Sequence, residues 1–295
     1  NDKMGIGTTT PNWKLSVSGI GSFDDYVRAS YITATSTTAT STFAGGVDLT
    51  SSTGQGLNFG SNTLFYQNNQ RFLTSSTTAA GNLTIGYQSP TSLDANGGLY
   101  NTGLGYQAMQ NATSTDYNTA VGYQALKGSA TISNTGSNTA VGYQALTSNT
   151  TGVYNTANGT YSLRSNTTGL ANTAIGYESL RDNTVGKDNT AIGNQNLTGN
   201  TTGNGNTAVG RISLSNTTSS NNTAVGLFSL RDNTTGTGNI GLGYYSGYGD
   251  GSTVDQRSVI DNYMTFIGYQ ASRDASIAST AALTNGIAIG NNARV

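Results

Sequence analysis

A nine-residue motif, Asn-Thr-Ala-Val-Gly-Tyr-Gln-Ala-Leu, recurs with variations from about residue 82 to the end of the chain. Its glycines are Gly86, Gly105, Gly122, Gly142, Gly159, Gly176, Gly193, Gly210, Gly226, Gly243, Gly268 and Gly290. Successive glycines are 19, 17, 20, 17, 17, 17, 17, 16, 17, 25 and 22 residues apart. A unit this short buries no core of its own, so each must stack on its neighbours. The period predicts an all-β protein, a parallel β-solenoid or β-roll with turns of about 17 residues.

Composition agrees with stacked turns rather than with a globular core. Leu, Ile, Val and Phe account for only 53 of 295 residues, and the 13 basic residues nearly balance the 14 acidic ones. So few large apolar residues suggest disorder, but disordered chains usually also carry a high net charge. We expect backbone hydrogen bonds and columns of identical side chains to replace part of the apolar core.

Cysteine and histidine are both absent, which excludes disulfides, thiolate nucleophiles, imidazole bases and the usual transition-metal sites. We therefore predict no enzyme, no catalytic residues and no cofactor. The few, scattered Lys and Arg residues predict no nucleic-acid partner, and no apolar window is long enough for a membrane span. Long Ser, Thr, Asn and Gly tracts favour an extracellular location.

Three regions differ in composition and residue pattern. Residues 1–45 contain a turn-plus-strand signature and a stretch of Thr, Ser and Ala, which predict an extended, low-complexity β segment. Residues 46–81 alternate more strongly, and Asn68-Asn69 predicts a hairpin within 62–74, so this region is interpreted as a hairpin-rich connector. Residues 82–295 form the β-roll repeat array, with an insertion at 249–255.

Two apolar columns define the expected core when the Asn of each motif is numbered as position one. Positions four and nine lie on opposite faces of a straight strand, so both reach one interior only if the chain bends at or after the glycine. Each turn is then two short strands joined by tight corners. We predict that the position-four column points inward as the spine, with core members Val121, Val141, Ile175, Ile192, Val209 and Val225. The position-nine column is expected beside it: Leu126, Leu146, Leu163, Leu180, Leu197, Leu214 and Leu230.

Two further columns carry predictions. The first Asn of each motif is expected to form an amide ladder along the stack, since identical residues recur once per turn. Position three is Ala or Gly almost throughout, as in Ala120 and Ala140, and such small residues let another backbone approach closely. A thin polar solenoid gains a second buried face by oligomerising, so we predict a homo-oligomer, most simply a parallel homotrimer, with head-to-tail filament formation left open.

The repeats also resemble a known family. Asn118 to Gly122 and Gly286 to Ala293 are similar to the Ser-Val-Ala-Ile-Gly repeats in the heads of trimeric autotransporter adhesins, and this similarity spans about residues 82–295. The opening Gly5 to Pro11 resembles a motif of bacterial and phage tail-fibre-like proteins. The resemblance implies a left-handed parallel β-roll, trimeric assembly, surface exposure and adhesion. It supplies no catalytic residues.

Three groups of side chains stand out, two of them as candidates for binding. Tyrosines at position six form either an aromatic platform for a glycan or protein, or a structural stack. Leu-Arg-Asp at 180–182 and 230–232, with Arg164 in the equivalent place, predicts a solvated charged edge that blocks lateral strand pairing. Asp250, Asp255 and Asp261 are a Ca²⁺ candidate on composition, but their spacing fits no known calcium loop. The tyrosines are Tyr87, Tyr106, Tyr123, Tyr143 and Tyr177.

Two functions follow. The first is a non-enzymatic structural or adhesive fibre of a bacterial cell surface, which binds a host-surface glycan or protein through a repetitive face. The alternative is a phage tail fibre or spike, located on the virion tail, that binds host polysaccharide with or without cleaving it. Cleavage requires a pair of carboxylates, and no such pair stands out in the sequence.

Overall fold

The structure is a computed structural model that describes residues 4–6, 15–17, 65–67, 70–75, 81–89, 98–112, 116–128, 136–248, 261–274 and 283–295. The chain divides into two compact units, Asn1–Asn58 and Phe59–Val295. In the first unit, β1 (Met4–Ile6) pairs in parallel with β2 (Leu15–Val17).

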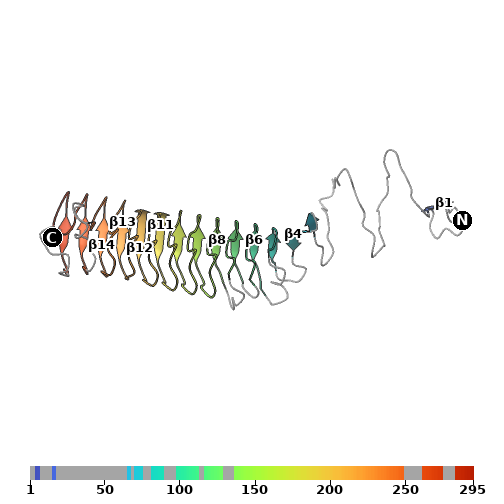
Figure 1. Ribbon diagram of the computed structural model, residues 1–295, viewed down its shortest axis with the longest axis horizontal. Coiled ribbons are helices and arrows are strands. Elements are labelled where there is room, and N and C mark those ends of the chain that lie inside the picture. Colours follow the sequence, from blue (N-terminus) through green and yellow to red (C-terminus); the bar gives the residue numbers. More distant parts are fainter. Residues whose placement is uncertain are drawn as a thin grey trace. The chain divides into compact units, whose positions relative to one another are not determined.

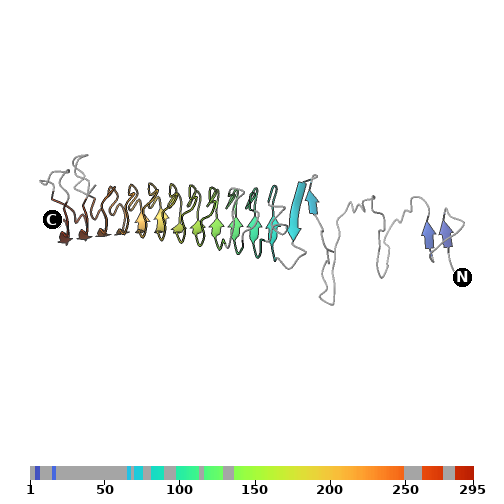
Figure 2. The same cartoon turned by 90° about the horizontal axis from the view of Figure 1, so that it is seen from below.

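The second unit contains one 14-stranded sheet in which β3 to β16 are hydrogen-bonded in strict sequence order. The hairpin expected around Asn68-Asn69 is present, because β3 and β4 pair antiparallel and β4 then pairs antiparallel with β5. From β5 onward every pairing is parallel (Figures 1 and 2). The strands are β3 (Phe65–Gln67), β4 (Gln70–Ser75), β5 (Leu83–Ile85), β6 (Thr102–Leu104), β7 (Thr119–Val121), β8 (Thr139–Val141), β9 (Thr156–Asn158), β10 (Thr173–Ile175), β11 (Thr190–Asn194), β12 (Thr207–Arg211), β13 (Thr223–Val225), β14 (Ile240–Leu242), β15 (Thr265–Ile267) and β16 (Ile287–Ile289).

Each turn stacks on the next in register, so that like residues face like residues. Thr173, Ala174 and Ile175 of β10 pair with Thr190, Ala191 and Ile192 of β11. The predicted parallel solenoid is therefore present. In the described residues, all regular elements are strands, and none is a helix suited to crossing a membrane.

The interior contains the small residues at position three, not the branched residues at position four. In β10, Ala174 is fully buried, whereas Thr173 on one side is half-buried and Ile175 on the other is 38% exposed. A strand alternates its side chains, so burying position three forces positions two and four outward. The predicted inward spine is wrong for the following residues, each half-buried or exposed: Val121, Val141, Ile175, Ile192, Val209 and Val225.

The same finding removes position three as a surface for other chains. The alanines at this position contact the opposite side of their own coil. At Gly241, an added Cβ would lie 2.8 Å from Cγ of Leu230 and 2.6 Å from Oγ of Ser229. From β6 to β14 the coil is thus so thin that its sheet contributes only a methyl group, or a hydrogen, to the core. In β15 the buried Phe266 takes this place, next to Gly247, which has no side chain.

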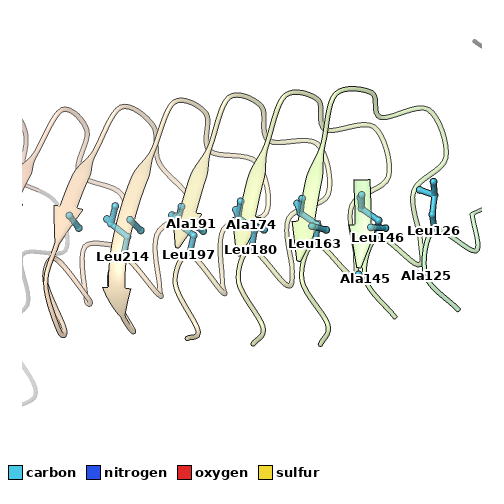
Figure 3. Close-up of a cluster of buried hydrophobic side chains, with 14 of the residues drawn as sticks. Ala125, Leu126, Ala145, Leu146, Leu163, Ala174, Leu180, Ala191, Leu197 and Leu214 are labelled. Carbon is cyan, nitrogen blue, oxygen red and sulfur yellow. The ribbon is translucent and has the colours of Figure 1, made fainter. Parts of the chain in front are cut away.

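Leucines supply the other half of the core. The position-nine side chains point inward and form one continuous row with the alanines (Figure 3). Each is at most 1% exposed, as the sequence predicted: Leu126, Leu146, Leu163, Leu180, Leu197, Leu214 and Leu230.

The leucines come from a tightly wound segment and not from the second strand that the sequence suggested. Position seven and position nine both have left-handed backbones, with φ of 53° at Glu178 and 51° at Leu180. Two such residues separated by one other curl the chain, so positions eight and nine both face inward: Ser179 and Leu180 are both fully buried. Left-handed conformations are costly for residues with a Cβ, which makes them hard to foresee from leucine or glutamine.

The asparagine ladder is present. In β11's turn, the Asn189 backbone N–H and Nδ2 donate to Oδ1 of Asn172 at 3.0 and 3.1 Å, and Nδ2 also donates to the Gly203 carbonyl at 2.8 Å. Asn206 repeats the pattern on Asn189. A second column at the far corner links Asn149, Asn166, Asn183 and Asn200 through their amides. Because these residues are fully buried, the ladders satisfy polar groups that would otherwise destabilise the fold.

Backbone glycine is required where each strand ends. Gly176 has φ of 121°, and an added Cβ would overlap the carbonyl of Gly193 in the next turn. We expect Gly176→Ala to lower the free energy of unfolding by more than about 3 kcal/mol, since neither the backbone nor its neighbour can move away. Denaturant unfolding followed by circular dichroism measures the loss.

Gly205→Ala is the matched control. Gly205 has φ of 64°, and Ala171 occupies the same place in an earlier turn with φ of 56°. An added Cβ would meet only the side chain of Asn221. This variant should lose about 1 kcal/mol; equal losses in the two variants would show that the stacking of the glycine column does not limit the spacing of turns.

Candidate functional site

The outer face of the sheet is the first candidate surface. Positions two and four project from it in two parallel columns, threonine in the first and branched aliphatics in the second, with few exceptions. Throughout β5 to β16, both columns are free of charged residues. Several members are strongly exposed for apolar side chains: Leu83 40%, Ile175 38%, Ile192 39%, Val225 39%, Ile240 38%, Ile287 64% and Ile289 64%.

The position-six tyrosines are the second candidate surface, and they stack on one another. Tyr106 and Tyr123 have ring centroids 5.1 Å apart with planes inclined by 8°, and Tyr123 and Tyr143 follow at 5.0 Å and 7°. Tyr87 joins the row tilted at 5.5 Å. The five candidate tyrosines are about two-fifths exposed, from 37% for Tyr106 to 44% for Tyr177.

Tyr161 interrupts this row. It stands at position seven and meets Tyr143 edge to face at 5.3 Å and Tyr177 at 6.5 Å. In the turns before Tyr161, position seven is a glutamine ladder, in which Nε2 of Gln124 donates to Oε1 of Gln107 at 2.6 Å. Nε2 of Gln144 donates to Gln124 at 2.7 Å.

The stack limits what the tyrosines can bind. Tyr106 and Tyr123 have the rings of adjacent turns on both sides, so a sugar ring has no free aromatic face on which to lie there. The row exposes ring edges, hydroxyl groups and the neighbouring amides. Tyr87, Tyr106, Tyr123 and Tyr143 thus form a continuous stack, and only the interrupted end near Tyr161 and Tyr177 departs from it.

A charged cluster lies next to the tyrosine row. Arg181 donates through Nε and Nη2 to both carboxylate oxygens of Asp182, at 2.9 and 2.8 Å, and its Nη1 lies 3.2 Å from Glu178. The hydrogen bonds to Asp182, followed by its charge, raise the pKa of Arg181. Arg164 lies over the Tyr161 ring at 5.0 Å.

Glu178 is held in its charged form. Burial acts to raise its pKa, but hydrogen bonds from Gln195 and Tyr177 and the charge of Arg181 outweigh burial and lower it. The same contact raises the pKa of Tyr177, whose hydroxyl donates to Glu178. A carboxyl with a lowered pKa is unprotonated at neutral pH, which makes Glu178 unsuited to general-acid catalysis.

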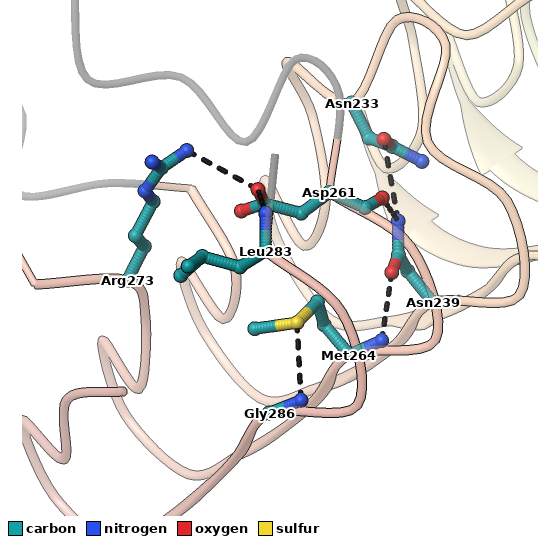
Figure 4. A network of polar contacts seen from close by, with 7 residues as sticks. All are labelled: Asn233, Asn239, Asp261, Met264, Arg273, Leu283 and Gly286. Carbon is teal, nitrogen blue, oxygen red and sulfur yellow. Dashed lines mark hydrogen bonds and ion pairs between the residues drawn. The ribbon is translucent and has the colours of Figure 1, made fainter. Parts of the chain in front are cut away.

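Asp261, the described member of the calcium candidate, belongs to a buried network (Figure 4). Its Oδ1 accepts from Nη1 of Arg273 at 3.2 Å and from the backbone N–H of Leu283 at 2.8 Å. The backbone carbonyl of Asp261 accepts a hydrogen bond from Nδ2 of Asn239. Asn239 is the last asparagine of the ladder: in the next turn Met264 occupies the equivalent position, and its backbone N–H donates to Oδ1 of Asn239. Asp250 and Asp255 lie outside the described residues. In the described ranges, no three His, Cys, Asp or Glu side chains come close enough to hold a metal ion.

No family model, curated protein or solved structure matches this chain significantly. The candidate surfaces are therefore interpreted from their own geometry.

Tyr143 provides a test of the tyrosine stack. Burial first, and then the charges of Tyr161 and Tyr123, raise its pKa above the ordinary value of 10.0. A raised tyrosine pKa contributes stability that is present below pH 10 and is lost as the pH rises through the folded-state pKa. The absorbance titration of the wild type minus that of Tyr143→Phe should isolate one phenol that ionises above pH 10.

The control is the same difference titration in denaturant, where the isolated phenol should return to about pH 10. A difference curve that is identical in folded and unfolded protein would mean that Tyr143 is not part of a closely stacked row.

Proposed function

We propose that the chain is a non-enzymatic, extracellular structural and adhesive fibre of a bacterial surface, assembled as a parallel homotrimer. The observation that carries the proposal is the outer sheet face of β5 to β16, with its uncharged columns of threonine and exposed branched aliphatics. Monomeric soluble proteins rarely leave so long an apolar stripe in water. Eleven strand spacings of about 4.8 Å give the stripe a length of roughly 50 Å.

Identical chains are the partner that best fits this face. Its two columns repeat with the spacing of the turns, so a second copy aligned in parallel offers a matching column at every level. Cyclic assembly about an axis parallel to the stack closes the interface without leaving an edge exposed. The resemblance to the heads of trimeric autotransporter adhesins supports three chains.

The contact face differs from the one expected from the sequence. Position three was expected to approach another chain, but it forms each chain's own core, with Ala120 and Ala140 both fully buried. In the proposed trimer, positions two and four meet at the axis. The tyrosine row and the charged cluster come from the segments that follow the strands, so they remain for a host-surface glycan or protein.

Absence of catalysis is part of the proposal. Glycoside hydrolysis needs one carboxyl that keeps its proton near neutral pH and a second that does not. Glu178 and Asp182 flank Arg181, and the pKa of Glu178 is lowered. This pair favours binding over cleavage. A phage tail fibre with the same fold remains the alternative setting for the molecule.

Two charges on the outer face should dissociate the trimer. We expect the double variant Ile175→Asp and Ile192→Asp to sediment as a monomer while the wild type sediments as three chains, because burying unpaired carboxylates costs several kcal/mol. Circular dichroism should show unchanged β structure, since both side chains lie outside the core.

Val185→Asp is the matched control, because Val185 is equally exposed, at 41%, but lies outside the strands. It should remain trimeric. A wild-type monomer, or a double variant that stays trimeric, would contradict assembly through this face.

A further inference from the structure

One part of the solenoid departs from the repeat in three ways. Between Asn206 and Asn222 the turn has 16 residues where its neighbours have 17. In the same turn, Thr217 replaces the asparagine of the second buried ladder. Position ten, which is arginine at Arg181 and Arg231, becomes small in the two turns between them.

These small residues open a groove. Thr198 and Ser215 hold position ten in successive turns, and Gly199 follows without a side chain. The groove has a volume of about 620 Å³ and is bounded by Arg181 at one end and Arg231 at the other. Three turn spacings separate the two arginines, or roughly 14 Å along the stack. None of the residues lining it belongs to a strand, so the outer sheet face does not contribute to it.

Both ends of the groove are held in place. Arg181 is fixed by its two-pronged contact with Asp182 and by Glu178. Arg231 lies 3.5 Å from Asp232 and over the rings of Phe228 and Tyr248, at 5.6 and 5.2 Å. A ligand therefore meets side chains that are already ordered, which lowers the entropic cost of binding.

The charges favour a neutral ligand. Two guanidinium groups face three carboxylates, those of Glu178, Asp182 and Asp232, so neither arginine has an uncompensated positive charge for an anion.

The polar groups of the groove are mixed. The Gln195 amide nitrogen donates to Glu178 and that of Asn216 donates to Asp232, which leaves both amide oxygens as acceptors. Ile212 adds an apolar patch between them. Hydroxyl groups, which both donate and accept, match this lining, and C–H faces match the isoleucine.

We propose that this groove binds a short neutral oligosaccharide lying along the solenoid axis. The inference rests on the proposed adhesive function and names the place and the ligand class for it. The rest of the repeat array serves as scaffold for this groove.

The test fills the groove without changing its charge. Glutamine occurs naturally at position ten as Gln110, so the double variant Thr198→Gln and Ser215→Gln should fold. We expect the wild type to bind immobilised oligosaccharides of neutral hexoses or N-acetylhexosamines, and the double variant to bind at least ten times more weakly. Thr147→Gln, the same change at position ten outside the groove, should bind like the wild type. The single variant Thr198→Gln serves if the double variant unfolds.

Three outcomes would overturn the inference: unchanged binding by the filled variant, binding only to uronic or sialic acid oligosaccharides, or no binding to any neutral oligosaccharide. Sedimentation of the same samples tests trimer formation on its own. It therefore distinguishes a groove that binds no oligosaccharide from a chain that does not assemble as proposed. A trimer that adheres to host cells equally well with a filled groove would leave the fibre intact and reject only the groove.

Discussion

The fold depends on in-register stacking, in which every residue lies over its counterpart one turn away. This constraint makes each column of the sequence a column in space. Asparagine can then donate to asparagine, as Asn189 does to Asn172, and tyrosine can stack on tyrosine. The glycine column lets backbones approach at the level where each strand ends. A chain with few large apolar residues is stabilised by repeating a favourable contact many times rather than by a large core.

Stacking also explains why the two sides of each turn contribute different residues to the core. The strand contributes alanine to the interior and the curled segment contributes leucine, as with Ala174 and Leu180. Because the strand's larger side chains cannot fit opposite a leucine in so thin a coil, they project outward, where another chain can cover them. The same geometry that keeps the core small thus generates the stripe that drives the proposed assembly.

Much of this architecture was predictable, because period and turn chemistry are local properties. The glycine spacing predicted the parallel solenoid, Asn68-Asn69 predicted the hairpin, and the leucine column predicted half of the core. The orientation of the strand was not predictable from apolarity alone. Ile175 is larger and more apolar than Ala174, and only the left-handed curl at Glu178 and Leu180 decides which of the two fits inside.

The groove depends on a departure from the repeat, which a search for regularity overlooks. The regular tyrosines are largely covered by one another, as in the pair Tyr106 and Tyr123. The groove lies where Thr198 and Ser215 replace arginine, a difference visible in the sequence only after the columns are aligned.

Distances between equivalent positions test the stacking most directly. The chain has no cysteine, so spin labels can be placed on pairs of engineered cysteines at position six, with labelled chains diluted into unlabelled protein. Tyr143 and Tyr244 are six turns apart and Asn194 and Tyr244 are three. The account predicts that the first pair is more distant than the second by about 14 Å, three strand spacings. Equal distances, or a separation that does not grow with the number of turns, would contradict it.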